Sequence, residues 1–243
     1  MPISGKNRML LEIEQIHSYY SKSHILHGVS MDLKEGDLTC LLGRNGVGKT
    51  TTLKSIMGIV RARSGEILFK DSNLVGKAPY EIARMGVGYV PEDRRIFKSL
   101  TVHENLLMGI KHGENVSKQV WTLDKIYETF PQLKGRRENK GAHLSGGEQQ
   151  MLTVTRTLLG NPELILVDEP TEGLAPLIAK SVLEMLSAVR KSGVTILLVE
   201  QNFKAAVTLA NRFYIMSKGQ VVFDGDGPAL RAADDIRKNY LEV

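Results

Sequence analysis

The chain has 243 residues, of which 42% are hydrophobic and 24% are charged, and its formal net charge is +5. This length suits one domain, or one domain with an insertion, and the composition is that of an ordinary soluble globular protein. Apolar runs such as residues 164–167 are too short to cross a bilayer, and residues 1–8 lack the apolar core of a signal peptide. We therefore expect the chain to stay in the cytoplasm.

The single cysteine, Cys40, excludes an internal disulfide and is expected to be a core residue because it lies inside an apolar run. The basic balance fits either a nucleic-acid partner or an anionic membrane surface. The charges are scattered, however, apart from the pairs Arg94-Arg95 and Arg136-Arg137. A solvated surface is therefore the better interpretation.

Strand signals dominate the N-terminal part of the chain. Residues 10–16 alternate between apolar and polar side chains, and residues 25–33 contain a second candidate strand. A tight turn at residues 35–37 leads into the apolar run 38–42, which has the pattern of a buried strand. Further on, the sequence predicts a helix, a turn and two short strands, at residues 51–57, 63–65, 66–69 and 87–90.

The rest of the chain changes character twice. Residues 102–160 are rich in helix formers, and an amphipathic helix is expected over residues 176–191. Strand signals return in four segments, at residues 163–167, 194–199, 213–216 and 220–223. Strands separated by helices favour a largely parallel sheet. The outline is an α/β core interrupted by a mainly helical insert.

The segment GRNGVGKT, residues 43–50, fits the phosphate-loop pattern GxxxxGK[ST] between a predicted strand and a predicted helix. Its glycines let backbone N–H groups wrap phosphates, and the helix N-terminus adds a partial positive charge. Lys49 is expected to reach the terminal phosphates, and the Thr50 hydroxyl is expected to bind Mg²⁺. The alternative, a glycine-rich turn without a ligand, requires all these positions to match by accident.

The segment LILVDEP, residues 164–170, predicts a buried strand that delivers two carboxylates at its C-terminal end. Ligands of open α/β sheets bind at that edge. Asp168 is suited to hold Mg²⁺, and Glu169 to orient and deprotonate an attacking water. An acidic turn without function is the alternative, and the preceding phosphate loop disfavours it.

The segment LSGGEQQ, residues 144–150, contains the S-x-x-E spacing of a capping box at Ser145 and Glu148. A helix is therefore expected to begin here and to end near Gly160. Two glycines beside a capped N-terminus expose unpaired N–H groups, which favours a second anion site. A purely structural cap is the alternative for this segment.

Together these motifs resemble the ATP-binding subunit of an ABC transporter, with Walker A at residues 43–50, the signature at 144–150 and Walker B ending at Asp168-Glu169. The resemblance covers nearly the whole chain. It implies an α/β fold of the P-loop ABC cassette type, with a largely parallel core sheet, an N-terminal antiparallel β part and a helical subdomain inserted before the signature. The single cassette of residues 1–243 would then divide into a core of about 1–92 and 161–243 and a helical subdomain of about 93–160.

The resemblance also implies roles for individual residues, with ATP and Mg²⁺ as cofactors. The catalytic residues would be Glu169 and Gln201, and Mg²⁺ would be held by Thr50, Glu92 and Asp168. The residues expected to bind ATP are Tyr20, which would stack on adenine, Gly43, Arg44, Asn45, Gly46, Val47, Gly48, Lys49, Thr50, Thr51 and, from a second cassette, Ser145, Gly146, Gly147 and Glu148. Tyr19, beside Tyr20, is expected to pack.

Three positions depart from the commonest pattern of the family. Glu92 replaces a glutamine and adds a negative charge, while Gln201 replaces a histidine and cannot titrate near neutral pH. Ala175 stands where an aspartate is common, so communication across the dimer is expected to differ in detail.

The segments PEDRRIF, TEGLAP and LVEQN together resemble the branched-chain amino acid importer subgroup. Relatives that energise uptake of urea or short amides are similar, and the segments SHIL and TCLL keep that alternative open. The resemblance implies a peripheral protein on the inner face of the cell membrane. Its partners would be a second cassette, identical or not, transmembrane permease subunits and, indirectly, a solute-binding protein.

A nucleic-acid-associated ATPase of the chromosome-maintenance or repair type shares these motifs. Such proteins carry a long coiled coil between the phosphate loop and the signature, whereas residues 51–143 are too few and have no sustained heptads. A small-molecule kinase or GTPase would leave the signature unexplained. We therefore expect an ATP-hydrolysing transport motor with no nucleic-acid partner.

Overall fold

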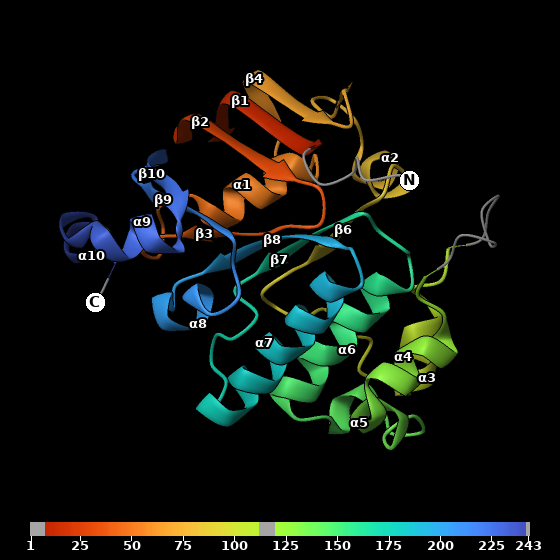
Figure 1. Ribbon diagram of the computed structural model, residues 1–243. Helices are drawn as coiled ribbons and strands as arrows, with labels where there is room; N and C mark the ends of the chain where they lie inside the picture. Colours follow the sequence, from red (N-terminus) through yellow and green to blue (C-terminus); the bar gives the residue numbers. More distant parts are fainter. Residues whose placement is uncertain (1–7, 112–119, 242–243) are drawn as a thin grey trace, which may run out of the picture.

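The computed structural model describes residues 8–111 and 120–241. Residues 1–7, on which the expectation about a signal peptide partly rests, lie outside these ranges. Two sheets lie one above the other, with a helix between them and a group of helices below (Figure 1). None of the helices in the described ranges combines the length and apolar composition that a bilayer span requires.

The upper sheet is antiparallel and confirms the strand signals of the N-terminal part. Its strand order is β2-β1-β4-β5. The alternating segments are longer than the sequence predicted, and these strands are β1 (Met9–Tyr20), β2 (Ser23–Lys34), β4 (Ala62–Phe69) and β5 (Ser72–Asn73). Alternate side chains of β1 are buried, so one face of this sheet packs on the rest of the molecule.

The turn expected at residues 63–65 is wrong, because these residues lie inside β4. The pairing of β4 with β1 shifts register between Glu14 and His17, opposite this segment. Gly65 takes φ +88° there, and a Cβ atom at this position would overlap the carbonyl oxygens of Glu14 and Gln15. The glycine that suggested a turn therefore serves a β-bulge, where two backbones come unusually close.

The lower sheet has six strands in the order β10-β9-β3-β8-β7-β6. All neighbours are parallel except β10, which pairs antiparallel with β9. The strands are β3 (Leu38–Leu42), β6 (Val87–Val90), β7 (Leu164–Asp168), β8 (Thr195–Glu200), β9 (Arg212–Ser217) and β10 (Gln220–Asp226). A largely parallel core sheet is thus confirmed, and β3, β7 and β8 are buried throughout, as expected for strands covered on both faces.

Helix α1 (Lys49–Ile56) lies between the two sheets. Its Leu53 and Ile56 join one apolar cluster with side chains of both sheets. Below the lower sheet, α6 (Gly146–Leu158) and α7 (Pro176–Lys191) belong to a second cluster, which includes Cys40 of β3. The predicted helix at residues 176–191 and the buried position of Cys40 are both confirmed.

Short helices complete the chain. Between β6 and β7 lie α3 (Val102–Leu107), α4 (Leu123–Thr129), α5 (Pro131–Lys134), the 3₁₀ turn η2 (Gly141–His143) and α6. The others are α2 (Pro79–Arg84), α8 (Phe203–Val207), α9 (Gly227–Ala232) and α10 (Asp234–Tyr240).

The register of the parallel strands determines which residues meet at one edge. Leu42 pairs with Glu200, and Asp168 pairs with Val199, so β3, β8 and β7 end side by side. The phosphate loop after β3 and the carboxylates at the end of β7 are therefore separated only by β8, at the sheet edge where ligands of such folds bind.

Candidate functional site

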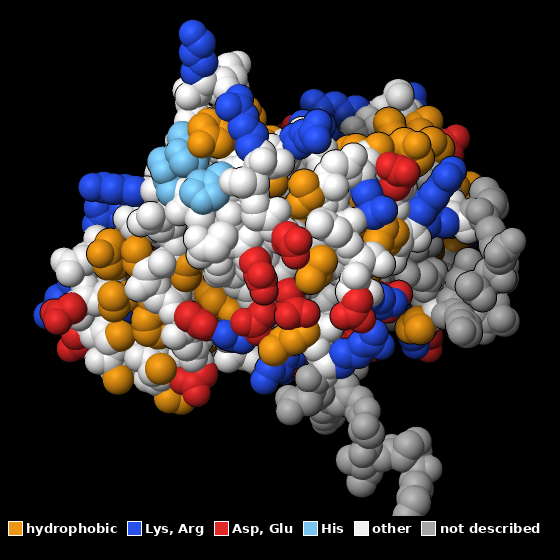
Figure 2. All heavy atoms as spheres, turned by 90° about the horizontal axis from the view of Figure 1, so that it is seen from above, with side chains coloured by type: hydrophobic (Ala, Val, Ile, Leu, Met, Phe, Trp, Pro, Cys, Tyr) orange, Lys and Arg blue, Asp and Glu red, His pale blue; other side chains and the backbone are white. Residues whose placement is uncertain are grey.

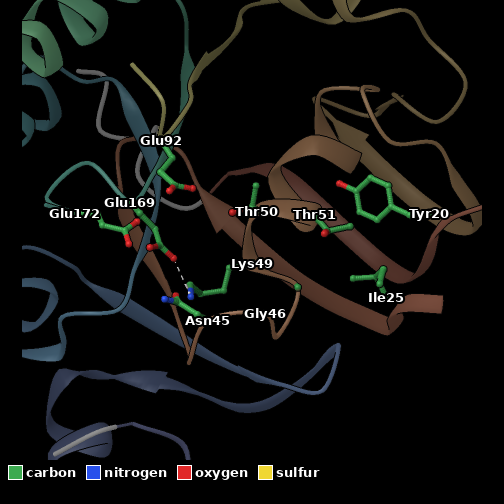
Figure 3. A pocket seen from close by; sticks show the side chains of 11 residues that line it. Tyr20, Ile25, Asn45, Gly46, Lys49, Thr50, Thr51, Glu92, Glu169 and Glu172 are labelled. Carbon is green, nitrogen blue, oxygen red and sulfur yellow. Dashed lines mark ion pairs between the residues drawn. The ribbon is translucent and has the colours of Figure 1, made fainter. Parts of the chain in front are cut away.

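A cavity of about 360 Å³ opens at this edge of the sheet. It is lined by Tyr20, Ile25, Asn45, Gly46, Gly48, Lys49, Thr50, Thr51, Glu92, Glu169 and Glu172. Figure 3 shows Tyr20 and Ile25 at one end, the three glutamates at the other, and Lys49 with the loop between them. A ligand with an aromatic part beside Tyr20 and an anionic part over Lys49 and the loop matches this distribution, and the glutamates beyond the loop favour a cation bound with it.

The phosphate loop adopts a backbone that needs glycine. Gly43 has φ +150°, and a Cβ atom there would lie 2.6 Å from the Met216 carbonyl oxygen. Gly48 has φ +112° and is the N-cap residue of α1, with no side-chain cap. The first N–H groups of α1 are therefore left to a ligand, as a phosphate site requires.

Lys49 is 3% exposed, and its ammonium is held by three acceptors. It donates to the carbonyl oxygens of Gly43 at 2.8 Å and Arg44 at 3.1 Å, and it forms an ion pair with Glu169 at 2.9 Å. These contacts fold the side chain back over the loop (Figure 3). A buried charge needs such partners, and a phosphate could replace the carboxylate among them.

Thr50 and Asp168, far apart in sequence, meet below the loop. The Thr50 hydroxyl donates to Asp168 Oδ1 at 2.9 Å, and the Tyr89 hydroxyl donates to Asp168 Oδ2 at 3.1 Å. Burial raises the pKa of Asp168, and burial together with the Asp168 carboxylate raises the pKa of Tyr89. Tyr89 was not among the residues that the sequence singled out.

The Thr50 and Asp168 oxygen atoms suit Mg²⁺, which needs few protein ligands, better than a metal ion whose ligands all come from protein side chains. In the described part of the chain, no group of three or more His, Cys, Asp or Glu side chains is arranged to hold a metal ion. Mg²⁺ usually takes one or two carboxylates and completes its shell with water and substrate phosphates. The Thr50 hydroxyl and the Asp168 carboxylate beside a phosphate loop provide that kind of partial site.

Three carboxylates crowd one end of the cavity: Glu92, Glu169 and Glu172 (Figure 3). Glu169 has φ +40°, a left-handed backbone that is uncommon for a non-glycine residue and recurs at functional sites. Burial and the neighbouring Glu169 and Glu92 raise the pKa of Glu172 to about 7. No local pattern singles out Glu172, because it reaches the cavity only through the turn that follows Glu169.

The structure separates the two neighbouring tyrosines. Tyr20 is 46% exposed and lines the cavity, whereas Tyr19 stacks on His24 with ring centroids 4.1 Å apart and lies beneath Arg63. His24 also contacts His17, at 3.1 Å between ring nitrogens, and His27, at 3.9 Å between centroids. Figure 2 shows the histidines as one group on the outer surface.

The signature segment lies elsewhere. Ser145 is the N-cap residue of α6, and its capping box with Glu148 is formed, as predicted. The Glu148 carboxylate accepts from the Ser145 N–H and also pairs with Arg136. None of the four residues from Ser145 to Glu148 lines the cavity of its own chain.

The remaining predicted residues are placed as follows. Gln201 follows β8, is exposed, and is not among the residues lining the cavity. Arg44 contributes its carbonyl oxygen to Lys49, and Val47 packs toward the core beside Gly43. The cavity thus gathers Tyr20, most of the phosphate loop, Glu92 and Glu169, with Asp168 directly beneath.

Known proteins match both sequence and fold. The family model described as ABC transporter matches residues 26–172, more than half of the chain. The chain is 42% identical to the high-affinity branched-chain amino acid transport ATP-binding protein BraG of Pseudomonas aeruginosa, over 96% of this chain and 99% of that protein. It is 32% identical to the probable branched-chain amino acid transport ATP-binding protein LivF of Archaeoglobus fulgidus, with the same coverage. The ADP conformation of MJ1267, an ATP-binding cassette of an ABC transporter, superposes with a TM-score of 0.82, 28% identity and coverage of 93% of this chain and 94% of that one.

Proposed function

This chain belongs to the ABC transporter family, and from that premise we propose that it is the motor subunit of an importer for branched-chain or other amino acids. Members of the family are ATPases that power transport, and this chain is an ATP-binding cassette of that kind. The 42% identity to a branched-chain amino acid transport protein, over nearly the full length of both chains, supports the choice of solute. Uptake of urea or short amides by the same motor remains the alternative.

The cavity accommodates ATP in one orientation. Tyr20 would stack on adenine, and the N–H groups of residues 43–51 with the Lys49 ammonium would surround the phosphates. ATP would then take the place of Glu169 among the partners of Lys49. The single observation that carries this assignment is the buried Lys49, held over a phosphate loop whose glycines have positive φ.

Mg²⁺ would lie between the Thr50 hydroxyl and Asp168, with Glu92 close enough to act on the same ion. The ion would neutralise charge on the transferred phosphoryl group. Glu169 would orient the attacking water and accept its proton, freed for this role once Lys49 binds phosphate. Gln201 would help as a hydrogen-bond donor to the γ-phosphate only after the segment following β8 moves toward the cavity.

Cassettes of this family work as dimers together with membrane permease subunits. We propose a head-to-tail pair in which Ser145, Gly146 and Gly147 complete the partner's site, since these residues lie away from the cavity of their own chain. Glu148 would act through the cap, because its carboxylate is already bound to Ser145 and Arg136. The helical subdomain of about residues 93–160 would contact the permease at the inner face of the cell membrane.

The architecture disfavours a nucleic-acid-associated ATPase. In the described ranges between α1 and α6, the helices have at most seven residues, as in α4. A long coiled coil cannot be built from such elements. The mainly helical segment is instead compact and shares its apolar cluster with the core sheet.

Reconstitution tests the proposal in two separate steps. In the first step, the purified chain should bind and hydrolyse ATP. In the second step, the chain is co-expressed with the permease and solute-binding subunits encoded beside it, and the complex should accumulate branched-chain amino acids in vesicles. If the complex hydrolyses ATP but takes up only urea, the proposed solute is wrong and the proposed motor role stands. Absence of ATP binding would refute the motor itself.

A further inference from the structure

A tyrosine on the edge strand β6 contacts the buried acidic group of the site. The Tyr89 hydroxyl donates to Asp168 Oδ2 at 3.1 Å, while Thr50 donates to the other oxygen, Oδ1, at 2.9 Å. The two oxygens of one carboxylate therefore have different partners, one from the sheet and one from the nucleotide loop. The two hydrogen bonds together orient the carboxylate, with Oδ1 toward Thr50 and Oδ2 toward Tyr89.

Strand register explains why a tyrosine at position 89 can reach Asp168. Tyr89 pairs with Leu166 in the parallel ladder between β6 and β7. Asp168 is two residues beyond Leu166, so its side chain points to the same face of the sheet. The long phenol side chain extends along that face to the strand end, and its ring packs against the apolar cluster between the sheets.

The contact matters because Asp168 has almost no access to water. Its exposed fraction is 0%, so its carboxylate depends on protein donors in place of solvent. If Thr50 and Asp168 hold Mg²⁺, the Thr50 oxygen would serve the ion and its hydroxyl would no longer donate to Oδ1. The bond from Tyr89 is then the remaining direct donor among those described.

We propose that Tyr89 is a positioning residue for the metal site: its hydroxyl holds Asp168 Oδ2, so that Oδ1 stays directed at Thr50 and Mg²⁺. The inference rests on the proposed role of Thr50 and Asp168 as Mg²⁺ ligands. Tyr89 is not among the residues that line the cavity, so it acts through Asp168. The phenol ring and the hydroxyl have separable tasks, since the ring fills the core and the hydroxyl orients the ligand.

Tyr89→Phe tests the hydroxyl alone, because the ring is kept. Another buried tyrosine offers a control: the Tyr214 hydroxyl donates to Asp32 Oδ1 at 3.1 Å, and neither residue lines the cavity. Tyr214→Phe therefore deletes a tyrosine–aspartate bond away from the cavity, together with the hydrogen bond that this hydroxyl accepts from the Asp32 N–H. Thermal unfolding of both variants measures the general cost of losing such a bond.

The direct readout is Mn²⁺ binding to the ADP-loaded protein, followed by electron paramagnetic resonance. A hydrogen bond to a charged group corresponds to roughly a tenfold or larger change in an equilibrium constant. We expect Tyr89→Phe to weaken Mn²⁺ binding about tenfold, with nucleotide binding in EDTA unchanged and the Mg²⁺ concentration for half-maximal hydrolysis raised by a similar factor. Tyr214→Phe should leave all three measurements at the wild-type level.

Wild-type Mn²⁺ affinity in Tyr89→Phe would overturn the proposal, and so would an equal loss in Tyr214→Phe. Tyr89→Met, a second variant without the hydroxyl, decides the question should the phenylalanine variant not fold. Asp168→Asn tests the metal site separately from the role of Tyr89. If it also leaves Mn²⁺ binding intact, the metal assignment of the proposed function fails; if it abolishes binding while Tyr89→Phe does not alter it, only the role of Tyr89 fails.

Discussion

Glu169→Gln separates two roles that the structure gives to one carboxylate. In the structure Glu169 is the ion-pair partner of Lys49, and in the proposed mechanism it is the base that accepts a proton from water. Glutamine has nearly the same shape but carries no charge and cannot accept that proton. The substitution should therefore change ATP binding and ATP hydrolysis in opposite directions.

The sizes of the two effects differ. Loss of a general base lowers the hydrolysis rate by about 10²- to 10⁴-fold. The charge effect on binding follows from the ion pair: two charges 2.9 Å apart attract by about 6 kcal/mol at an effective dielectric constant of 20. Most of this attraction is offset, because burying the glutamate charge costs more desolvation free energy than burying a neutral amide, and because the glutamine oxygen still accepts a hydrogen bond. We expect about 1.4 kcal/mol in favour of ATP, a tenfold tighter complex.

The assay pairs equilibrium binding of a fluorescent ATP analogue with single-turnover hydrolysis. Glu172→Gln is the matched control, because Glu172 lines the same cavity, whereas the ion pair with Lys49 is formed by Glu169. Because the pKa of Glu172 is raised to about 7, this substitution removes part of one negative charge at neutral pH, and it should keep most of the hydrolysis rate. Near-normal turnover by Glu169→Gln would refute the role of Glu169 as a base. An equal loss in Glu172→Gln would mean that cavity charge, not the position of Glu169, sets the rate.

Three further predictions concern two residues of the site and the histidine group on the outer surface. Lys49→Ala should abolish measurable ATP binding by calorimetry, since the phosphates lose their buried cation; unchanged affinity would contradict the phosphate-loop assignment. Tyr20→Ala should weaken ATP binding by about 1 kcal/mol or more. Tyr19→Ala should weaken it much less, because of the two tyrosines only Tyr20 lines the cavity. A larger loss in Tyr19→Ala would mean that Tyr19, and not Tyr20, contacts the nucleotide. The pKa of His24 is lowered below 6.5, chiefly by desolvation and by the charge of His27. His17 and Arg63 lower it more weakly, and a backbone hydrogen bond to Leu26 opposes the shift. The unfolded chain therefore takes up this proton first, so the melting temperature should fall as pH drops through 6.5 and lower, and His24→Gln should reduce that fall; identical pH profiles would refute the coupling.

Local pattern was sufficient for much of the fold. The phosphate loop, the capping box at Ser145 and the amphipathic helix at residues 176–191 depend on hydrogen bonds and burial within a few turns of chain, so their spacing carries the information. The turn expected at residues 63–65 was wrong because its glycine is required by a contact that is distant in sequence. Gly65 lies against the backbone of β1, some fifty residues earlier, and the residues around it in the sequence carry no sign of that contact.

Contacts between distant strands were decided only by the tertiary structure. Nothing near Tyr89 in the sequence connects it to Asp168, and only the family resemblance, not the local pattern, distinguished Tyr20 from Tyr19. The ladder register of β6 on β7 makes the first connection. In the β1–β2 ladder Tyr19 pairs with His24 and stacks on its ring, while Tyr20 lines the cavity. The sequence by itself therefore determined which chemical groups the site contains. The pairing of strands determined which of them meet, because a side chain's neighbours across a sheet depend on register and not on spacing along the chain.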